Sequence, residues 1–269
     1  MISAPIATLR LLSFVAVTLA MQLFYLPALV VNQKCAANCA RFYWRVVALL
    51  FGIGVLRHGV PTADRPVLFV ANHASYLDVI VLGSLLPACF VAKSEVAQWP
   101  GFGLLCRIGR TVFVDRSRAA SARGRDELRR RLDAGEPLVL VPEGTSNDGN
   151  RVLPFKSALF AVAEQPVAGA DGQPRALTVQ PVSLAYTRLD GLPMPRAFRP
   201  FYAWYGGMTL AGHLFEVLGL GNVTVEVIFH PPVTIAAFSG RKEMARHCYA
   251  VVNRGVALAL AGRLPAATA

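Results

Sequence analysis

The chain has 269 residues, of which 54% are hydrophobic and 16% are charged, and this composition excludes an intrinsically disordered protein. Lysine and arginine outnumber aspartate and glutamate by 27 to 16, so the formal net charge of +11 predicts an anionic partner such as phospholipid or nucleic acid. The arginine-rich residues 116–131 contain no aromatic residue and the five cysteines form no C-x-x-C pair, so we expect no nucleic-acid partner, disulfide framework or zinc site.

The first predicted element is an apolar helix near the N-terminus. Residues 11–33 carry no charge, and at ~1.5 Å per helical residue they are long enough to cross a hydrocarbon layer of ~30 Å. A secretory signal peptide is the alternative, but the apolar run continues well beyond the small-residue stretch TLA and so favours a membrane anchor. Because Lys34, Arg41, Arg45 and Arg57 follow the run and only Arg10 precedes it, we expect an inner (cytoplasmic) membrane location, with the rest of the chain facing the cytosol.

A second apolar stretch, residues 46–56, is too short to span a bilayer. It predicts an interfacial or re-entrant helix, and packing into a protein core is an equally good interpretation. We therefore expect two regions: membrane-anchoring helices in residues 1–58 and one α/β domain in residues 59–269.

From Pro66 onward, short β-rich runs alternate with helical stretches. The expected strands lie within residues 66–72, 88–94, 110–116, 137–144, 177–186 and 222–233. The expected helices are residues 78–86, 117–134, 155–164 and 241–260. This alternation predicts an α/β fold with a central, largely parallel β-sheet flanked by helices, in which functional loops follow the carboxyl ends of strands.

The first motif that carries chemistry is Asn72-His73-Ala74-Ser75-Tyr76-Leu77-Asp78, directly after an expected strand. A carboxylate on one imidazole nitrogen fixes the tautomer and leaves the other nitrogen free to accept a proton, so His73 and Asp78 are candidate catalytic residues. The alternative is a capping box, in which Asp78 only satisfies a backbone donor at the start of the next helix. Both can hold together. Because G-x-S-x-G and H-E-x-x-H are absent, we expect a base that acts on the hydroxyl of a substrate.

Cations follow two other expected strands. Arg116 ends the strand within residues 110–116 and could bind a phosphate through its planar guanidinium, or form an ordinary ion pair with Asp115. Lys93 and Lys156 are further candidate ligands for an anionic group, and solvated surface lysines are the alternative.

The third motif is Val141-Pro142-Glu143-Gly144-Thr145-Ser146, again after an apolar strand. Glycine allows close approach of a ligand to the backbone, and the flanking side chains offer polar groups. A tight turn is the alternative. The candidate binding residues in this motif are Glu143, Gly144, Thr145 and Ser146.

In their order and spacing, these motifs resemble those of the lysophosphatidic acid acyltransferases (1-acyl-sn-glycerol-3-phosphate O-acyltransferases), a family of glycerolipid acyltransferases. The signatures N-H-x-x-x-x-D, G-x-x-F-x-x-R and P-E-G-T-R correspond to residues 72–78, 110–116 and 142–146, and a fourth, a strand with an embedded proline, corresponds to residues 179–182. Two positions depart from the pattern. Arg110 stands where the second signature has glycine, and Ser146 stands where the third has arginine.

The resemblance implies an enzyme in which His73, oriented by Asp78, deprotonates the acceptor hydroxyl for attack on an acyl thioester. It also implies that Arg116 binds the acceptor phosphate and that Glu143 and Gly144 line the acceptor pocket. The expected partners are a membrane phospholipid surface, a lysolipid acceptor and a thioester donor, either acyl-CoA or acyl-[acyl carrier protein], with no metal and no bound cofactor.

The expected reaction converts 1-acyl-glycerol-3-phosphate to phosphatidic acid in phospholipid biosynthesis. Because Ser146 removes one cation from the third signature, an acceptor such as lyso-ornithine lipid is the alternative within the same chemistry. A non-catalytic, membrane-anchored protein that binds anionic lipid is the alternative outside it.

Overall fold

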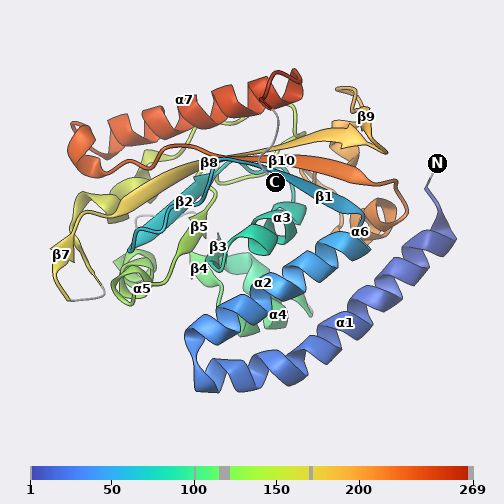
Figure 1. The fold of residues 1–269 in the computed structure, drawn as a ribbon, viewed down its shortest axis with the longest axis horizontal. Coiled ribbons are helices and arrows are strands. Elements are labelled where there is room, and N and C mark those ends of the chain that lie inside the picture. Colours follow the sequence, from blue (N-terminus) through green and yellow to red (C-terminus); the bar gives the residue numbers. More distant parts are fainter. Residues whose placement is uncertain (1, 100, 115–121, 170–171, 266–269) are drawn as a thin grey trace.

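The protein is described by a computed structural model that covers residues 2–99, 101–114, 122–169 and 172–265. Two layers of helices enclose a central β-sheet (Figure 1). The strands of the sheet are β1 (Ile53–His58), β2 (Val67–Ala71), β3 (Cys89–Lys93), β4 (Val112–Val114), β5 (Leu138–Leu140), β8 (Thr178–Leu189), β9 (Leu192–Pro193) and β10 (Val223–Phe229). A separate short pair is formed by β6 (Val167–Ala168) and β7 (Pro174–Arg175).

Helices fill the segments between the strands. The α-helices are α1 (Ala4–Val31), α2 (Gln33–Leu50), α3 (Leu77–Leu85), α4 (Phe102–Ile108), α5 (Ala122–Asp133), α6 (Leu210–Leu218) and α7 (Arg241–Leu260). The short 3-10 helices are η1 (Ser94–Gln98), η2 (Ser157–Glu164), η3 (Arg199–Phe201) and η4 (Ile235–Ala237).

The strand order of the sheet is β1-β10-β8-β2-β5-β3-β4, with β9 paired to the end of β8. Strands β8, β2, β5, β3 and β4 are all parallel, whereas β10 runs antiparallel to β8 and carries β1 parallel to itself. The prediction of an α/β fold with a largely parallel sheet and flanking helices is therefore confirmed. The carboxyl ends of β2, β3, β4 and β5 lie at one edge of this sheet, and the motifs at residues 72–78 and 142–146 follow the ends of β2 and β5.

Both faces of the sheet are buried, which explains why its strands are continuous apolar runs. In β2, Phe69 and Ala71 face the core beneath α2 and α3, while Leu68 and Val70 face the core beneath α5 and α7. This division follows from the alternation of side chains along a strand. Strand β2 is thereby packed on both faces, and this packing fixes the position of the loop that follows it at residue 72.

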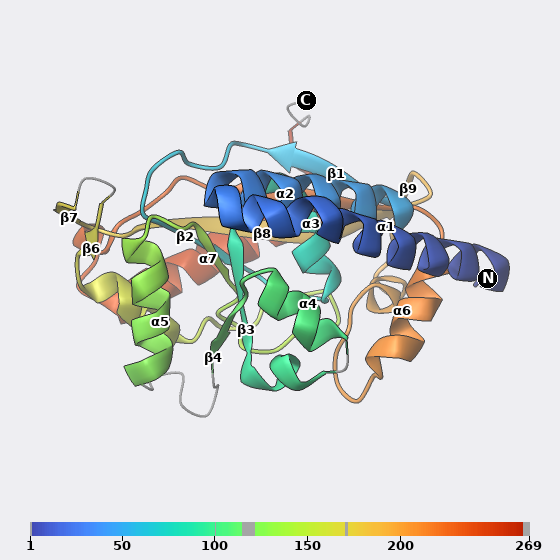
Figure 2. The same cartoon turned by 90° about the horizontal axis from the view of Figure 1, so that it is seen from below.

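The two N-terminal helices form a hairpin across the outside of the domain, as the two views of the fold show (Figures 1 and 2). The Arg10 guanidinium donates to the carbonyl oxygens of Leu218 and Leu220 at 3.1 and 3.0 Å, and the Tyr25 hydroxyl donates to the carbonyl of Ile108 at 3.1 Å. Because both halves of α1 are bonded to the domain, the helix lies along its surface.

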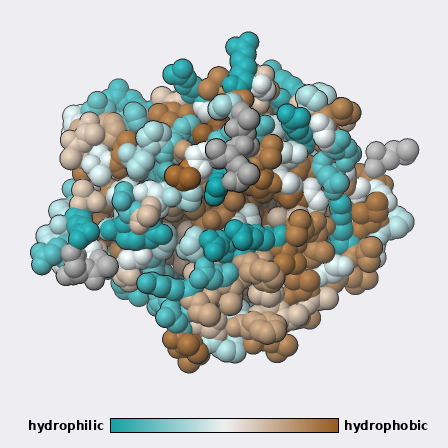
Figure 3. Space-filling model, viewed as in Figure 1, coloured by the Kyte–Doolittle hydropathy of each residue, from teal (hydrophilic) through white to brown (hydrophobic). Residues whose placement is uncertain are grey.

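The outer face of α1 is apolar and exposed. By length and composition α1 is a candidate membrane anchor, and only 17% of its most apolar window is buried in the protein. Hydrophobic surface gathers over α1 and α2 at the lower right of the space-filling view (Figure 3). The exposed apolar side chains of this helix include Leu9, Leu12, Leu19, Leu23, Phe24, Val30 and Val31.

Two expectations about secondary structure need correction. The second half of residues 46–56 is not helical: α2 ends at Leu50, and Ile53 begins β1, which pairs with β10. The first strand of the sheet thus lies before residue 59, although the division into two regions at that point stays a prediction. Residues 155–164, expected as an α-helix, contain the 3-10 helix η2.

Candidate active site

His73 lies in the turn that joins β2 to α3, at the carboxyl edge of the sheet. The preceding residue fixes this turn, because the Asn72 amide donates to the carbonyl of Leu184 at 2.9 Å and accepts from its N–H at 2.7 Å. Leu184 belongs to the adjacent strand β8, so the end of β2 is tied to its neighbour by a side chain as well as by the sheet.

The structure brings His73 and Asp78 into direct contact. The Nδ1 atom of His73 lies 2.9 Å from Oδ2 of Asp78, and the Asp78 side chain is only 3% exposed. The same oxygen accepts the backbone N–H groups of Ala74 and Ser75 at 2.8 and 3.0 Å. Asp78 therefore satisfies backbone donors at the start of α3 and orients the imidazole at the same time, so the helix-start role and the histidine-orienting geometry occur together.

This geometry leaves the second imidazole nitrogen available. Since Asp78 accepts the proton on Nδ1, the neutral ring carries a free lone pair on Nε2. No hydrogen bond connects Nε2 to another described residue, and His73 lines a cavity of about 660 Å³. The arrangement can remove a proton from a hydroxyl group that enters this cavity.

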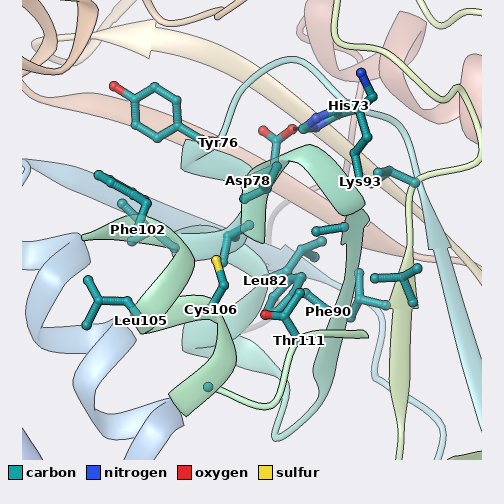
Figure 4. Close-up of a pocket in the computed structure, with 18 of the residues that line it drawn as sticks. His73, Tyr76, Asp78, Leu82, Phe90, Lys93, Phe102, Leu105, Cys106 and Thr111 are labelled. Carbon is teal, nitrogen blue, oxygen red and sulfur yellow. Dashed lines mark hydrogen bonds and ion pairs between the residues drawn. The ribbon is translucent and has the colours of Figure 1, made fainter. Parts of the chain in front are cut away.

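The cavity extends from the histidine into the apolar interior. Figure 4 shows His73, Asp78 and Lys93 at one end, with Leu82, Phe90 and Leu105 among the side chains that line it. Its walls come from α1 and α2, from α3 and α4, and from the strands between them. A cleft lined mostly by apolar side chains suits a hydrocarbon chain, because burying each CH₂ group is favourable by ~0.8 kcal/mol.

Glu143 supports the loop that carries His73 through hydrogen bonds on the side away from the cavity. Its Oε1 atom accepts the N–H of His73 at 2.7 Å, and Oε2 accepts the Leu153 N–H at 2.8 Å and the Asn147 amide at 2.9 Å. Glu143 is 2% exposed and does not line the cavity. Its observed contacts thus support the backbone of the loop that carries His73, whereas its neighbours Gly144, Thr145 and Ser146 do line the cavity.

Burial raises the pKa of Glu143 to about 7, because desolvation outweighs the three donors that favour the carboxylate. In the unfolded chain the group titrates near 4.5, so the folded state retains the proton between these two values. The stabilising contribution is complete below the unfolded pKa and is lost as pH rises through about 7. The cost at higher pH is about 3 kcal/mol.

We therefore expect the melting temperature of the wild-type protein in detergent micelles to fall between about pH 5 and about pH 8. Glu143→Gln should be less stable at low pH, because its amide NH₂ faces N–H donors, and should show a smaller decline across the same range. The difference between the two profiles isolates Glu143 from other titrating groups. Parallel profiles would contradict this assignment.

The candidate ligands for an anion are placed differently from one another. Lys93 lines the cavity and forms an ion pair with Glu95. Lys156 also lines it, packs close to Gly144, and forms no ion pair within the described part of the chain. Arg116 lies outside the described residues, and no arginine is among the described residues that line the cavity.

The structure adds residues that the motifs did not indicate. The Ser146 hydroxyl donates to the backbone carbonyl of Trp204. The backbone N–H of Trp204 donates in turn to the carbonyl of Ala74 at 2.9 Å. The Trp204 ring contacts those of Tyr76 and Trp99 at centroid distances of 6.1 and 5.5 Å, and all three line the cavity. No sequence signal marks these contacts, because two of them end on backbone carbonyls.

A group of three or more His, Cys, Asp and Glu side chains placed to bind a metal ion is not found in residues 2–99, 101–114, 122–169 and 172–265. Among the described residues that line the cavity, the acidic and basic side chains are those of His73, Asp78, Lys93, Glu95 and Lys156.

Comparison with known proteins agrees with this geometry. The family model described as Acyltransferase matches residues 55–185. The chain is 40% identical to a lyso-ornithine lipid O-acyltransferase of Brucella abortus, over 96% of this chain and 98% of the relative. It is 33% identical to a 1-acyl-sn-glycerol-3-phosphate acyltransferase of Neisseria gonorrhoeae, over 68% of this chain and 66% of the relative.

A solved structure has the same fold. The 1-acyl-sn-glycerophosphate acyltransferase PlsC of Thermotoga maritima aligns with a TM-score of 0.60 at 21% identity, covering 95% of this chain and 99% of that one. With the motifs, the fold and a relative matched over almost its whole length, the chain belongs to the lysophosphatidic acid acyltransferase family of glycerolipid acyltransferases.

Proposed function

We propose that the protein transfers an acyl chain from a thioester to the free hydroxyl of lyso-ornithine lipid. The observation that carries the acyl-transfer chemistry is the His73–Asp78 pair, whose contact of 2.9 Å lies at the end of the apolar cavity. The choice of acceptor rests on the relatives of Brucella abortus and Rhizobium meliloti, both named lyso-ornithine lipid O-acyltransferase and 40% and 42% identical to this chain.

In the proposed reaction, Nε2 of His73 takes the proton of the acceptor hydroxyl as the oxygen attacks the thioester carbonyl. The resulting tetrahedral oxyanion collapses, the carbon–sulfur bond breaks, and the imidazolium returns its proton to the leaving thiolate. Asp78 stays ionised and stabilises the imidazolium between these two steps. The thioester is already activated, so the proposal requires no cofactor, and acyl-CoA or acyl-[acyl carrier protein] serves as the co-substrate.

The charges around the cavity support a zwitterionic acceptor. Ornithine carries a carboxylate and an ammonium, whereas a phosphate monoester carries a charge of about −1.5 to −2 at neutral pH. Among the described lining residues, Lys93 is already paired with Glu95, and Lys156 remains to bind one anionic group. Ser146 stands at the position where the third family signature has an arginine, and its hydroxyl already donates to the Trp204 carbonyl.

Lysophosphatidic acid is the second candidate acceptor. It is favoured by the three signatures and by the relatives of Neisseria gonorrhoeae and Neisseria meningitidis, which are named 1-acyl-sn-glycerol-3-phosphate acyltransferase. Arg116, in the second signature, would bind its phosphate, with Lys93 or Lys156 as a second cation.

We further propose that the exposed apolar face of α1 binds the membrane, since a surface of this extent is unfavourable in water. Lys34, Arg41 and other cations that follow α1 would contact anionic headgroups on the cytosolic side of the inner membrane. A lysolipid would then reach the cavity from the bilayer, while the thioester donor arrives from the cytosol.

A single panel assay tests acceptor and donor together. The purified protein in mixed micelles is offered lyso-ornithine lipid, lysophosphatidic acid and lysophosphatidylethanolamine, each with acyl-CoA and with acyl-[acyl carrier protein], and products are measured by mass spectrometry. We expect kcat/KM for lyso-ornithine lipid to exceed that for the other acceptors at least about tenfold, a difference of ~1.4 kcal/mol. A preference for lysophosphatidic acid would establish the second candidate, and no transfer in any combination would leave only a lipid-binding protein.

A further inference from the structure

We propose that Tyr186 is a positioning residue that holds the carboxylate of Asp78 in the orientation needed to steer His73. Tyr186 lies on β8, and its hydroxyl donates to Oδ1 of Asp78 at 2.8 Å. The residue is 2% exposed and does not line the cavity. It therefore acts on the reaction only through Asp78, and the inference rests on the proposed role of His73 as the base.

The two carboxylate oxygens of Asp78 have different partners. Oδ2 accepts from Nδ1 of His73 and from the backbone N–H groups of Ala74 and Ser75. Oδ1 accepts from Tyr186, its single hydrogen-bond donor among the described residues. Without the phenol, Oδ1 would be buried with no donor, which is costly for an ionised group, and the plane of the carboxylate would be held by the Oδ2 contacts alone.

Tyr186 is itself held firmly. Its ring stacks on that of Tyr202 at a centroid distance of 6.2 Å and an interplanar angle of 19°. Two residues earlier on the same strand, the Leu184 carbonyl accepts a hydrogen bond from the side-chain amide of Asn72, and the Leu184 N–H donates one to the oxygen of that amide. The same stretch of β8 thus fixes the backbone before His73 and the carboxylate behind it.

The Tyr186 phenol keeps its proton in the folded protein at neutral pH and can donate it to the Asp78 carboxylate in a hydrogen bond. Burial, together with the charge of Asp78, raises the pKa of Tyr186 well above its ordinary value of 10.0. Because Tyr186 does not line the cavity, its hydroxyl acts as a hydrogen-bond donor to Asp78 and does not exchange a proton with the substrate. Its effect is to draw electron density from the Asp78 carboxylate and to fix its direction.

Tyr186→Phe removes this hydrogen bond and keeps the ring. We expect kcat to fall about tenfold with KM unchanged, because a hydrogen bond to a charged group contributes ~1.5 kcal/mol or more. A carboxylate with one donor fewer attracts the imidazolium more strongly, so the acidic limb of the kcat/KM profile should move to higher pH by about half a unit.

Tyr202→Phe is the matched control. The Tyr202 hydroxyl is also buried, but it donates to the carbonyl of Gly221 at 3.0 Å and does not bond to Asp78. The two variants each lose one phenolic hydrogen bond from the same ring stack. We expect Tyr202→Phe to lower the melting temperature to a similar extent while kcat and the acidic limb stay at wild-type values.

Equal kcat values and equal acidic limbs in the two variants would overturn the proposal. If Tyr186→Phe does not fold, 3-fluorotyrosine at position 186 retains the hydroxyl and makes it a stronger donor, so the acidic limb should move to lower pH. An unchanged limb in that protein would also overturn the proposal.

A further readout does not depend on which acceptor the enzyme uses. The NMR signals of the His73 Nδ1–H group, followed in the protein labelled at histidine, should shift in Tyr186→Phe and not in Tyr202→Phe, because this group bonds to the carboxylate that Tyr186 holds. Failure of the panel assay would therefore refute the proposed function without deciding the role of Tyr186, and unchanged His73 signals in Tyr186→Phe would refute that role even in an active enzyme.

Discussion

His73→Ala should reduce acyl transfer by about a thousandfold with every acceptor and donor, because positioned general bases contribute ~10²- to ~10⁴-fold. The loss should appear in kcat and in kcat/KM alike, since the imidazole accepts a proton only as the reaction proceeds. Initial rates with the most active pair of the panel assay, measured at saturating acceptor, provide the test.

The structure indicates that this variant keeps its fold. The His73 side chain is 19% exposed, and among the described residues its hydrogen-bond partner is Asp78. Asp78 retains Ala74, Ser75 and Tyr186 as donors when the imidazole is removed. We therefore expect an unchanged circular dichroism spectrum and unchanged binding to lipid vesicles. A kcat within tenfold of wild type would exclude His73 as the base.

Asp78→Asn should affect both the orientation of His73 and the start of α3, because Asp78 bonds to the imidazole and to the backbone N–H groups of Ala74 and Ser75, whereas His73→Ala removes the imidazole alone.

The six predicted strands and the contact between His73 and Asp78 could be anticipated from the sequence, since a buried parallel strand is a continuous apolar run and its carboxyl end marks functional loops. The double role of Asp78, both in capping and in orienting the imidazole, could be stated only as two alternatives until the distances were available.

Other features depend on contacts that have no local pattern. Tyr186 follows Asp78 by 108 residues, and only the pairing of β8 with β2 brings them together. The strand β1 is hidden in an apolar run that continues from α2, and its partner β10 is about 170 residues away. In such a run, periodicity does not separate a buried strand from the end of a buried helix.

Ser146, which replaces the arginine of the third family signature, makes a contact that the sequence does not reveal. Its position was visible in the sequence, but its partner, the backbone carbonyl of Trp204, leaves no trace there. The bond links the loop after β5 to residues that follow β9, and Trp204 is tied in turn to Ala74 beside the histidine. The serine thus belongs to the wall of the cavity on which the acceptor choice is proposed to depend.

Ser146→Arg should turn the acceptor preference toward lysophosphatidic acid. A guanidinium on this wall can form charge-assisted, bidentate hydrogen bonds to a phosphate, which contribute ~1.5 to ~3 kcal/mol and predict a gain of about 10- to 100-fold in kcat/KM for that acceptor. The same charge repels the ammonium of lyso-ornithine lipid, and the Trp204 carbonyl loses its hydroxyl donor. The ratio of the two kcat/KM values, measured in one competition assay, should therefore reverse.

Ser146→Gln is the control for this change, because it adds bulk and removes the hydroxyl without adding charge. It should lower kcat/KM for both acceptors by similar factors. The gain in Ser146→Arg should also shrink as salt is raised from ~0.05 to ~0.5 M, since the Debye length shortens and the attraction between guanidinium and phosphate is screened. If Ser146→Arg changes both acceptors equally, the headgroup is recognised elsewhere, and Lys156, unpaired among the described lining residues, becomes the next position to substitute.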